Sequence, residues 1–420
     1  MTYDVVVIGA GLAGLTAALR LAEEGRRVLI VAKGVGATHL SPPTIDVLGY
    51  VDGPVESPAR ALEDLAASHP QHPYGHLRVE LIADSIEWFK ARVADQGYRG
   101  GLEDNFLLPT AVGVAKPAAV VPETMAAGDL RAAGRYVFVG LKGLKDFYPS
   151  YLADNLRRAR TPSGEPVSAR GVELAPPLGG EGDVSSTGFA RRFEQPEFRA
   201  AVVRELQPHL VAGELVGFPA VLGLEHAQEV WHDLEHRLGH RVFEVPTLPP
   251  SVPGIRLFET MKAALHRAGG RLVLGSEVVG AVHANGRVEG VAALTAARTV
   301  TYHAPSFVLA SGGFAAGGLH SDSFGKIRET VFDLPLGYAP EPGRPRFAPG
   351  YFDEHPISRT GVAVDDKLRP VAPDSAPVYE NLRVAGATLG GAVPWREASG
   401  NGLSLATGYA AAAAILERGS

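Results

Sequence analysis

The feature that most constrains this chain is a glycine-rich turn placed between an apolar run and an amphipathic segment. The apolar run Asp4–Ile8 leads directly into the turn Gly9–Gly14, which reads Gly-Ala-Gly-Leu-Ala-Gly. A short apolar run that ends at glycine predicts a strand buried on both faces, and apolar residues at helical spacing over Leu12–Glu24 predict a helix. A second apolar run, Val28–Val31, follows. This order predicts a right-handed βαβ unit at the start of a parallel sheet.

The spacing of the glycines in this turn indicates a phosphate-binding site. Gly9 permits the tight turn, Gly11 lets a phosphate approach the backbone, and Gly14 allows close packing of helix on strand. The free N–H groups at the start of such a helix bind the phosphate of a nucleotide or flavin. The alternative is a plain glycine-rich turn, which the flanking strand and helix make the weaker interpretation. The expected cofactor contacts here are Gly9, Gly11, Leu12, Ala13 and Gly14.

The end of the second strand departs from the usual dinucleotide pattern. Such strands commonly end in Asp or Glu, which accepts a hydrogen bond from a ribose hydroxyl. Here Lys33 follows the strand, and a lysine cannot accept that bond but can face a phosphate. We therefore expect Lys33 and Gly34 at the cofactor, with Thr38 and His39 of the next loop, and FAD and FMN both remain open. The alternative is that Lys33 is only solvated.

Two later segments have the composition expected around a flavin. Ser306–Ala310 is an apolar run that ends in Ser311-Gly312, and small residues at a strand end let the backbone approach a cofactor. The final helix is expected from Gly402 to about Leu416, and a helix N-terminus near the flavin ring would stabilise negative charge on it. Each segment alone is equally consistent with a helix cap or a tight turn. The cofactor contacts expected from these segments are Ser311, Gly312, Gly386, Gly402 and Leu403.

The length of 420 residues suggests two or three structural units. We predict an α/β fold: a Rossmann-like flavin-binding domain, with a parallel sheet and a three-stranded meander, into which an α+β cap domain is inserted. The Asn285-Gly286 dipeptide predicts a hairpin turn in the meander. The flavin-binding domain is expected to comprise residues 1–95, 253–315 and 375–420, and the cap to comprise 96–252 with a return at 316–374.

The composition excludes several kinds of chemistry. Because the chain has no cysteine, it cannot hold a disulfide, a cysteine-ligated zinc or a cysteine-ligated iron–sulfur cluster. A net charge of −6 argues against general nucleic-acid binding. No apolar window reaches the roughly 20 residues of a membrane span and no secretion signal precedes the first strand, so we expect a cytoplasmic protein. No metal site is expected, since the histidines between 226 and 240 are interpreted as a solvated or partly buried helix face.

The order of these elements resembles the flavoproteins that include the fumarate reductase and succinate dehydrogenase flavoprotein subunits. Four further segments are similar to the family of B subunits of anaerobic glycerol-3-phosphate dehydrogenase, and the resemblance extends over essentially the whole chain. The most specific piece is Thr-Leu-Pro-Pro-Ser-Val-Pro-Gly-Ile-Arg-Leu, at 247–257. The four segments are Gly140–Phe147, Phe218–Leu224, Pro246–Leu257 and Ala385–Gly391.

This resemblance implies a specific activity. The family's complex oxidises sn-glycerol 3-phosphate to dihydroxyacetone phosphate and delivers the electrons to quinone. The resemblance favours FMN in this subunit and leaves FAD open. It implies two partners, an FAD-containing catalytic subunit and an iron–sulfur subunit at the inner face of the cell membrane. The alternatives are a stand-alone flavin oxidoreductase on another small anionic substrate, and a non-catalytic flavin relay or scaffold.

Substrate oxidation would need a base for the hydroxyl proton and a cationic group for the phosphate. His355 and Arg359 are the candidate catalytic pair, because both lie in a proline-interrupted loop just before the terminal flavin segment. The alternative, which we favour, is that Arg359 forms a structural ion pair and His355 caps a turn. Arg256 is either a further candidate or an anchor of the domain junction.

Overall fold

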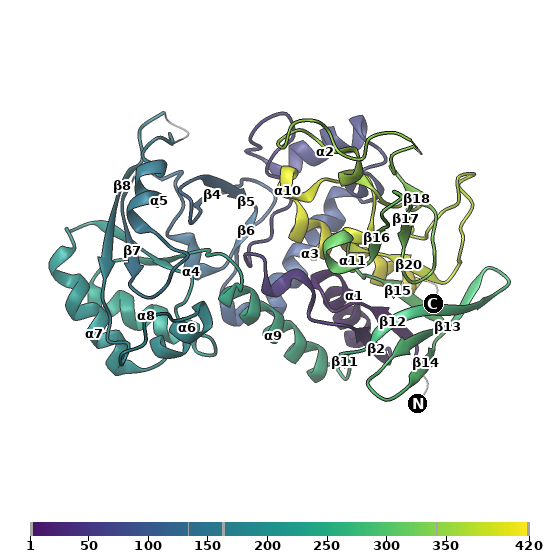
Figure 1. Ribbon diagram of the computed structural model, residues 1–420, viewed down its shortest axis with the longest axis horizontal. Helices are drawn as coiled ribbons and strands as arrows, with labels where there is room; N and C mark the ends of the chain where they lie inside the picture. The colour runs from purple at the N-terminus through teal and green to yellow at the C-terminus, as the bar shows by residue number, and fades with distance from the viewer. Residues whose placement is uncertain (1–2, 133, 162–163, 342, 418–420) are drawn as a thin grey trace.

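The computed structural model describes residues 3–132, 134–161, 164–341 and 343–417, which form two lobes joined by a narrower region (Figure 1). The first lobe is built on a five-stranded sheet in the order β11-β2-β1-β15-β20. All neighbouring strands in it are parallel, which confirms the Rossmann-like architecture. Its strands are β1 (Val5–Ile8), β2 (Val28–Ala32), β11 (Arg271–Leu274), β15 (Ser306–Leu309) and β20 (Leu382–Val384).

Two buried helices, α1 (Leu12–Glu23) and α11 (Gly400–Leu416), pack against each other beside this sheet. Their approach depends on Gly408, where an added Cβ would lie 2.4 Å from the carbonyl oxygen of Ala13. The last helix is thereby held against the first, close to the glycine-rich turn. The other helices of this lobe are α2 (Pro58–Ser68), α3 (Val79–Arg92), α9 (Val252–Arg267) and α10 (Pro394–Glu397).

The expected meander is present as the antiparallel sheet β12-β13-β14. Asn285 (φ 50°) and Gly286 (φ 68°) both take the positive φ of a type I′ turn, which is why this dipeptide predicts the hairpin. The meander strands are β12 (Glu277–Ala284), β13 (Arg287–Leu294) and β14 (Thr299–His303). Two further antiparallel pairs are β16 (Leu319–Ser321) with β17 (Ile327–Glu329), and β18 (Leu336–Gly337) with β19 (Gly361–Val362).

The second lobe contains a four-stranded sheet in the order β10-β9-β7-β8. This inserted domain differs in one respect from the expected α+β cap, because its main sheet is parallel throughout. Helices connect successive strands, as parallel pairing requires. The strands are β7 (Arg135–Leu141), β8 (Ser168–Leu174), β9 (Glu214–Pro219) and β10 (Val242–Val245), and the helices are α5 (Pro149–Leu156), α6 (Ser186–Phe193), α7 (Pro196–Leu206) and α8 (Ala227–Leu238).

The hairpin of β4 (Phe106–Pro109) and β5 (Ala115–Ala118) lies between the lobes (Figure 1). Beside it are the strand pair β3 (Arg99–Gly100) and β6 (Val120–Val121), and the short helix α4 (Glu123–Ala126). Buried apolar residues form one large cluster within 5–120 and 257–415 and a second within 127–252. The domain boundaries given from the sequence stay a prediction.

Candidate functional site

The glycine-rich turn encloses an open position at Gly11. A Cβ added to Gly9 would lie 2.2 Å from the Ala310 oxygen, and a Cβ added to Gly14 would lie 2.0 Å from the Gly9 oxygen. Neither position therefore has room for a side chain. Gly9 also has φ +107°, which favours glycine. At Gly11, in contrast, no described atom lies within 4 Å of the added Cβ. The backbone is therefore tightly packed on both sides of an open space at Gly11.

The N-terminus of α1 at this space has the properties of an anion site. Gly11 is the N-cap residue, no side chain caps the helix, and its first turn holds no acidic residue. Leu12 and Ala13 begin the helix, and the N–H groups of such first residues have no partner within their own helix. Together with the positive end of the helix dipole, these groups favour a phosphate.

The loop after β2 reaches the same turn. An added Cβ at Gly36 would lie 2.8 Å from Gly11 Cα, so this loop passes directly beside the phosphate space. Thr38 is buried there. Nε2 of His39 is buried and has no hydrogen-bond partner in the part of the chain that the structure describes. The His39 ring packs edge-on against Phe258 of α9, with ring centroids 4.8 Å apart. An unpaired buried ring nitrogen in this loop is a candidate contact for a polar cofactor atom.

Lys33 is placed differently from what a phosphate ligand would need. Its Nζ lies 3.1 Å from Glu277 Oε2, and its side chain is 73% exposed. This is close to the alternative given from the sequence, a solvated lysine at a strand end. The cofactor roles of Lys33 and of the exposed Gly34 stay predictions.

The two later segments converge on the glycine-rich turn. Ala310 packs against Gly9, and the next residue, Ser311, has a buried Oγ without a partner among the described residues. Gly312 has φ +81°, and its N–H donates to Thr388 Oγ1 at 3.0 Å. Gly386 has φ +72°, with its added Cβ 2.9 Å from Cβ of Ala13. The structure thus brings these predicted residues together, although each glycine is also explained by its backbone conformation.

The N-terminus of α11 is joined to a segment that the sequence analysis did not single out. Gly402 donates its N–H to the Asp46 carbonyl oxygen at 2.9 Å. The Asn401 amide donates to the Pro42 and Thr44 carbonyl oxygens at 3.0 and 2.9 Å. No side chain caps α11 and its first turn holds no acidic residue. Leu403 is buried in this first turn.

An ion pair links this segment to the β4–β5 hairpin. Lys116, on β5, pairs through Nζ with Oδ2 of Asp46. Asp46 is only 9% exposed. Its Oδ1 and the Oγ1 of Thr44 are buried without hydrogen-bond partners within the described ranges. The only local signal for this segment was the Pro42-Pro43 pair, which marks an irregular loop but not its chemistry.

His355 and Arg359 have the structural contacts that we favoured as the alternative to catalysis. Arg359 Nη2 lies 3.2 Å from Glu354 Oε2, and Nη1 donates to the Gly391 oxygen at 2.9 Å. The hydrogen bond from Arg359 holds the pKa of the Glu354 carboxyl below its usual range. Nδ1 of His355 accepts from the Ala348 N–H at 3.1 Å. A catalytic role for the pair stays a prediction with no support from these contacts.

Arg256 lies at the domain junction and contacts both lobes. It extends from α9 to Glu244 on β10, with Nη1–Oε2 at 2.7 Å and Nη2–Oε1 at 3.0 Å. Its Nε also donates to the Gly223 oxygen at 2.8 Å. The Glu244 side chain is 0% exposed and that of Arg256 is 8% exposed. These contacts agree with the interpretation of Arg256 as an anchor.

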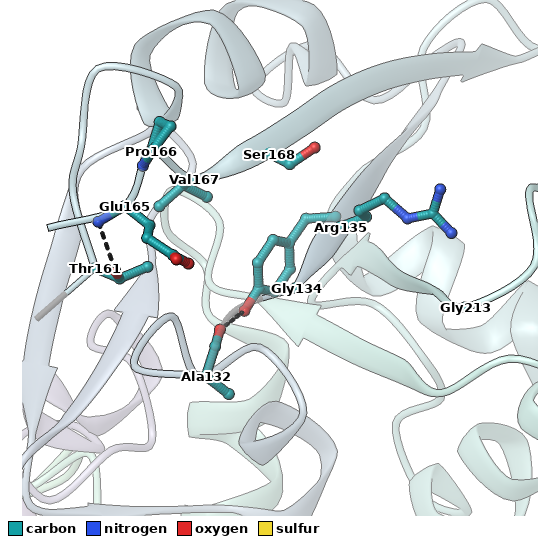
Figure 2. Close-up of a pocket in the computed structure, with 10 residues that line it drawn as sticks. Ala132, Gly134, Arg135, Thr161, Glu165, Pro166, Val167, Ser168 and Gly213 are labelled. Carbon is teal, nitrogen blue, oxygen red and sulfur yellow. Dashed lines mark hydrogen bonds between the residues drawn. The ribbon is translucent and has the colours of Figure 1, made fainter. Parts of the chain in front are cut away.

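None of these groups lines the pocket in the second lobe that Figure 2 shows. It is at the amino ends of β7 and β8, where Arg135 and Ser168 begin their strands. The Tyr136 hydroxyl at this pocket donates to the Ala132 oxygen at 3.1 Å. Because parallel sheets bind ligands at their carboxyl ends, this pocket is not part of the candidate site.

Comparison with known proteins identifies the family. A family model described as FAD binding domain matches residues 4–403. The chain belongs to this FAD-binding family. It is 35% identical to a probable B subunit of anaerobic glycerol-3-phosphate dehydrogenase from Halobacterium salinarum, over 99% of this chain and 98% of the relative. It is 31% identical to the B subunit of anaerobic glycerol-3-phosphate dehydrogenase from Pectobacterium carotovorum, over 100% of both chains.

These matches also assign the chain to the family of B subunits of anaerobic glycerol-3-phosphate dehydrogenase, as the resemblance indicated. Among solved structures it aligns with a 3-ketosteroid delta1-dehydrogenase from Sterolibacterium denitrificans, with a TM-score of 0.48 and 13% identity over 99% of this chain and 100% of that one.

Membership of the FAD-binding family bears on the cofactor. A flavin is supported, but the preference for FMN is not, since the matching family is described by FAD. The open space at Gly11, the uncapped α1 and the unpaired atoms of His39 and Ser311 fit a flavin. Within the described ranges, no group of three or more His, Asp or Glu residues is placed to hold a metal ion. No described helix has the length and apolar content that a membrane span requires.

Proposed function

We propose that this chain is a flavin-binding subunit of a quinone-linked glycerol-3-phosphate dehydrogenase. The complex would oxidise sn-glycerol 3-phosphate to dihydroxyacetone phosphate. The observation that carries this proposal is the full-length match to the B subunits of such enzymes, 31% identical over 100% of both chains in one case. The open, uncapped α1 N-terminus supports the flavin part independently.

The residues that would hold the flavin follow from the site. The N–H groups of Leu12 and Ala13 bind its phosphate, and Gly11 gives that phosphate room. His39 and Ser311 donate to or accept from polar atoms of the cofactor, which would pair their buried atoms. The uncapped start of α11 stabilises negative charge near the flavin ring. When bound, the flavin supplies the acceptor for the hydride of the alcohol.

The composition supports a division of labour between subunits. Since the chain has no cysteine, cysteine-ligated clusters that carry electrons onward belong to another protein. We propose an FAD-containing catalytic subunit and an iron–sulfur subunit as the partners, with attachment to the inner face of the membrane through the latter.

The test is anaerobic mixing of sn-glycerol 3-phosphate with the complex assembled from this chain and both partners. The expected result is bleaching of the flavin absorbance and reduction of a quinone analogue. Omission of this chain should abolish quinone reduction. Bleaching of the isolated chain by a different small anion, with no response to glycerol 3-phosphate, would instead support the stand-alone alternative.

A further inference from the structure

We propose that Glu397 is a positioning residue, which keeps the N-terminus of α11 uncapped so that its N–H groups are free to bind the flavin ring. This inference rests on the proposed function, because it concerns the helix start that we assign to the ring. Glu397 acts through Ala398 and Ser399, the two residues that connect it to α11, and not by contact with the cofactor.

Ser399 occupies the N-cap position of α11 without capping the helix. A serine at this position usually has an extended backbone, and its hydroxyl oxygen accepts from an N–H group of the first turn. Ser399 instead has φ −129° and ψ −5°, and no side chain caps α11. Its hydroxyl donates to Oε2 of Glu397 at 3.0 Å. A residue type that caps helices well is thus held away from the helix that it precedes.

The first N–H groups of α11 are open as a consequence. Gly402 donates its N–H to the Asp46 carbonyl oxygen at 2.9 Å, whereas the N–H groups that precede it, of Gly400 and Asn401, donate to no described residue. The Thr44 carbonyl oxygen accepts from the Asn401 side chain, and Thr44 itself has a buried Oγ1 without a partner in the described ranges. A buried hydroxyl in this state is costly unless a ligand or water satisfies it. Open donors beside an unpaired hydroxyl fit a polar ligand such as the flavin ring.

The turn between Glu397 and α11 is strained. Ala398 has φ 46° and ψ 62°, a left-handed conformation in which glycine is the usual residue at the end of a helix. Such strain persists only where the surrounding contacts impose it, and it is common at functional sites. A released turn would return Ala398 to a common conformation and let Ser399 take the extended backbone of a capping serine.

The contacts of Glu397 impose the observed conformation. Its Oε1 accepts from the Val393 N–H at 2.7 Å. Its Oε2 accepts from His72 Nε2 at 3.3 Å, in addition to the Ser399 hydroxyl. His72 donates from Nε2, because its Nδ1 accepts from the Tyr74 N–H at 3.1 Å. A carboxylate fixed by these donors, 15% exposed, holds the Ser399 hydroxyl away from the helix.

The experiment measures the midpoint potential of the flavin in the flavin-loaded chain, by equilibrium reduction against a reference dye. Glu397→Leu removes the acceptor, so Ser399 should cap α11 and compete with the ring. The double variant Glu397→Leu with Ser399→Ala lacks the same charge but has no hydroxyl with which to cap the helix. The preference for reduced over oxidised flavin should be about tenfold weaker in the single variant than in the double variant, as the loss of one hydrogen bond to a charged group predicts. Tenfold corresponds to a potential about 30 mV lower for a two-electron couple.

The matched control is Glu194→Leu. Glu194 also accepts from backbone N–H groups, those of Leu224 and His226 at 2.9 and 3.1 Å, but it lies in the second lobe. Glu194→Leu should leave the flavin potential unchanged. Ser399→Ala should shift the potential less in the unaltered chain than in Glu397→Leu, because the intact carboxylate already withholds the hydroxyl.

Equal potentials in Glu397→Leu and in the double variant would overturn the inference. If Glu397→Leu does not retain flavin, Glu397→Gln with and without Ser399→Ala repeats the comparison. Glutamine keeps the shape and one acceptor oxygen, so the difference should be smaller but of the same sign, and its absence would also overturn the inference. If the assembled complex still reduces quinone in those cases, the proposed function stands and only the role of Glu397 fails. An unaltered chain that binds no flavin would instead contradict the proposed function itself.

Discussion

Replacement of Arg256 by methionine tests the account of the domain junction. Arg256 is the only cation paired with Glu244 among the described residues, and the Glu244 side chain is 0% exposed. Methionine would leave a buried carboxylate whose remaining hydrogen bond, within the described part of the chain, comes from the Leu222 N–H at 3.0 Å. Removing one partner of a buried pair costs about 3–5 kcal/mol, because the remaining charge is neither hydrated nor paired. We therefore expect a loss of about 3–5 kcal/mol in the free energy of unfolding.

The double variant Glu244→Gln with Arg256→Met separates the charge effect from lost packing. It removes both charges, so its stability should lie within about 1 kcal/mol of the unaltered protein. The assay is urea unfolding followed by tryptophan fluorescence, to which Trp231 contributes; Trp231 is buried in the second lobe and donates to the Val242 oxygen at 2.7 Å. A loss of less than about 1 kcal/mol in Arg256→Met, or a double variant as unstable as the single one, would refute the reasoning.

Two further predictions concern packing and pH. Gly14→Ala would bring a Cβ to 2.0 Å from the Gly9 oxygen, so overpacking should lower the free energy of unfolding by about 1–3 kcal/mol. Thermal unfolding measures this loss, and an unchanged melting temperature would contradict the close contact. Burial opposes ionisation of Glu397, but hydrogen bonds from His72, the Val393 N–H and Ser399 hold its pKa below the usual range. A lowered folded-state pKa stabilises the protein above the unfolded pKa, about 4.3, and this stabilisation is lost as the pH falls through the folded value. The stability difference between the unaltered chain and Glu397→Gln should therefore shrink as the pH falls from about 6 to about 3, and a constant difference across that range would count against it.

The start of the fold was predictable because its signals are local. Val5–Ile8 and Val28–Ala32 are continuous apolar runs, and the intervening glycines have the spacing that backbone contacts require. The hairpin at Asn285-Gly286 was predictable for the same reason, since positive φ at both positions favours these residues.

The inserted parallel sheet was harder to predict. Ser168–Leu174 carries Arg170 and Glu173 and lies only partly buried, so it lacks the apolar run of a central strand. Arg170 instead pairs with Glu214 on β9, at 2.6 Å, a contact between segments distant in sequence. A strand with polar, partly exposed residues has no apolar run by which its sequence pattern could be identified.

The candidate site shows the same limit. Lys116 and Asp46 are 70 residues apart, and no local pattern links a lysine after one loop to an aspartate in another. Arg359 illustrates the converse, because its partner Glu354 lies only five residues away, yet the sequence did not say whether the arginine binds substrate or this neighbour. A sequence motif locates a site that is built from backbone groups, whereas an ion pair between two side chains depends on how the folded chain packs.

Gly11→Val provides the most direct test of the central claim that a flavin phosphate occupies the space at the α1 N-terminus. Gly11 has φ −71° and no described atom within 4 Å of an added Cβ, so valine should leave the fold intact. Gly53→Val is the matched control, because its added Cβ also meets nothing within 4 Å. Flavin is extracted with acid from both purified variants, quantified by chromatography and identified as FAD or FMN. We predict a near-complete loss of bound flavin in Gly11→Val with an unchanged circular dichroism spectrum, and full occupancy in Gly53→Val. Full flavin occupancy in Gly11→Val would contradict the account.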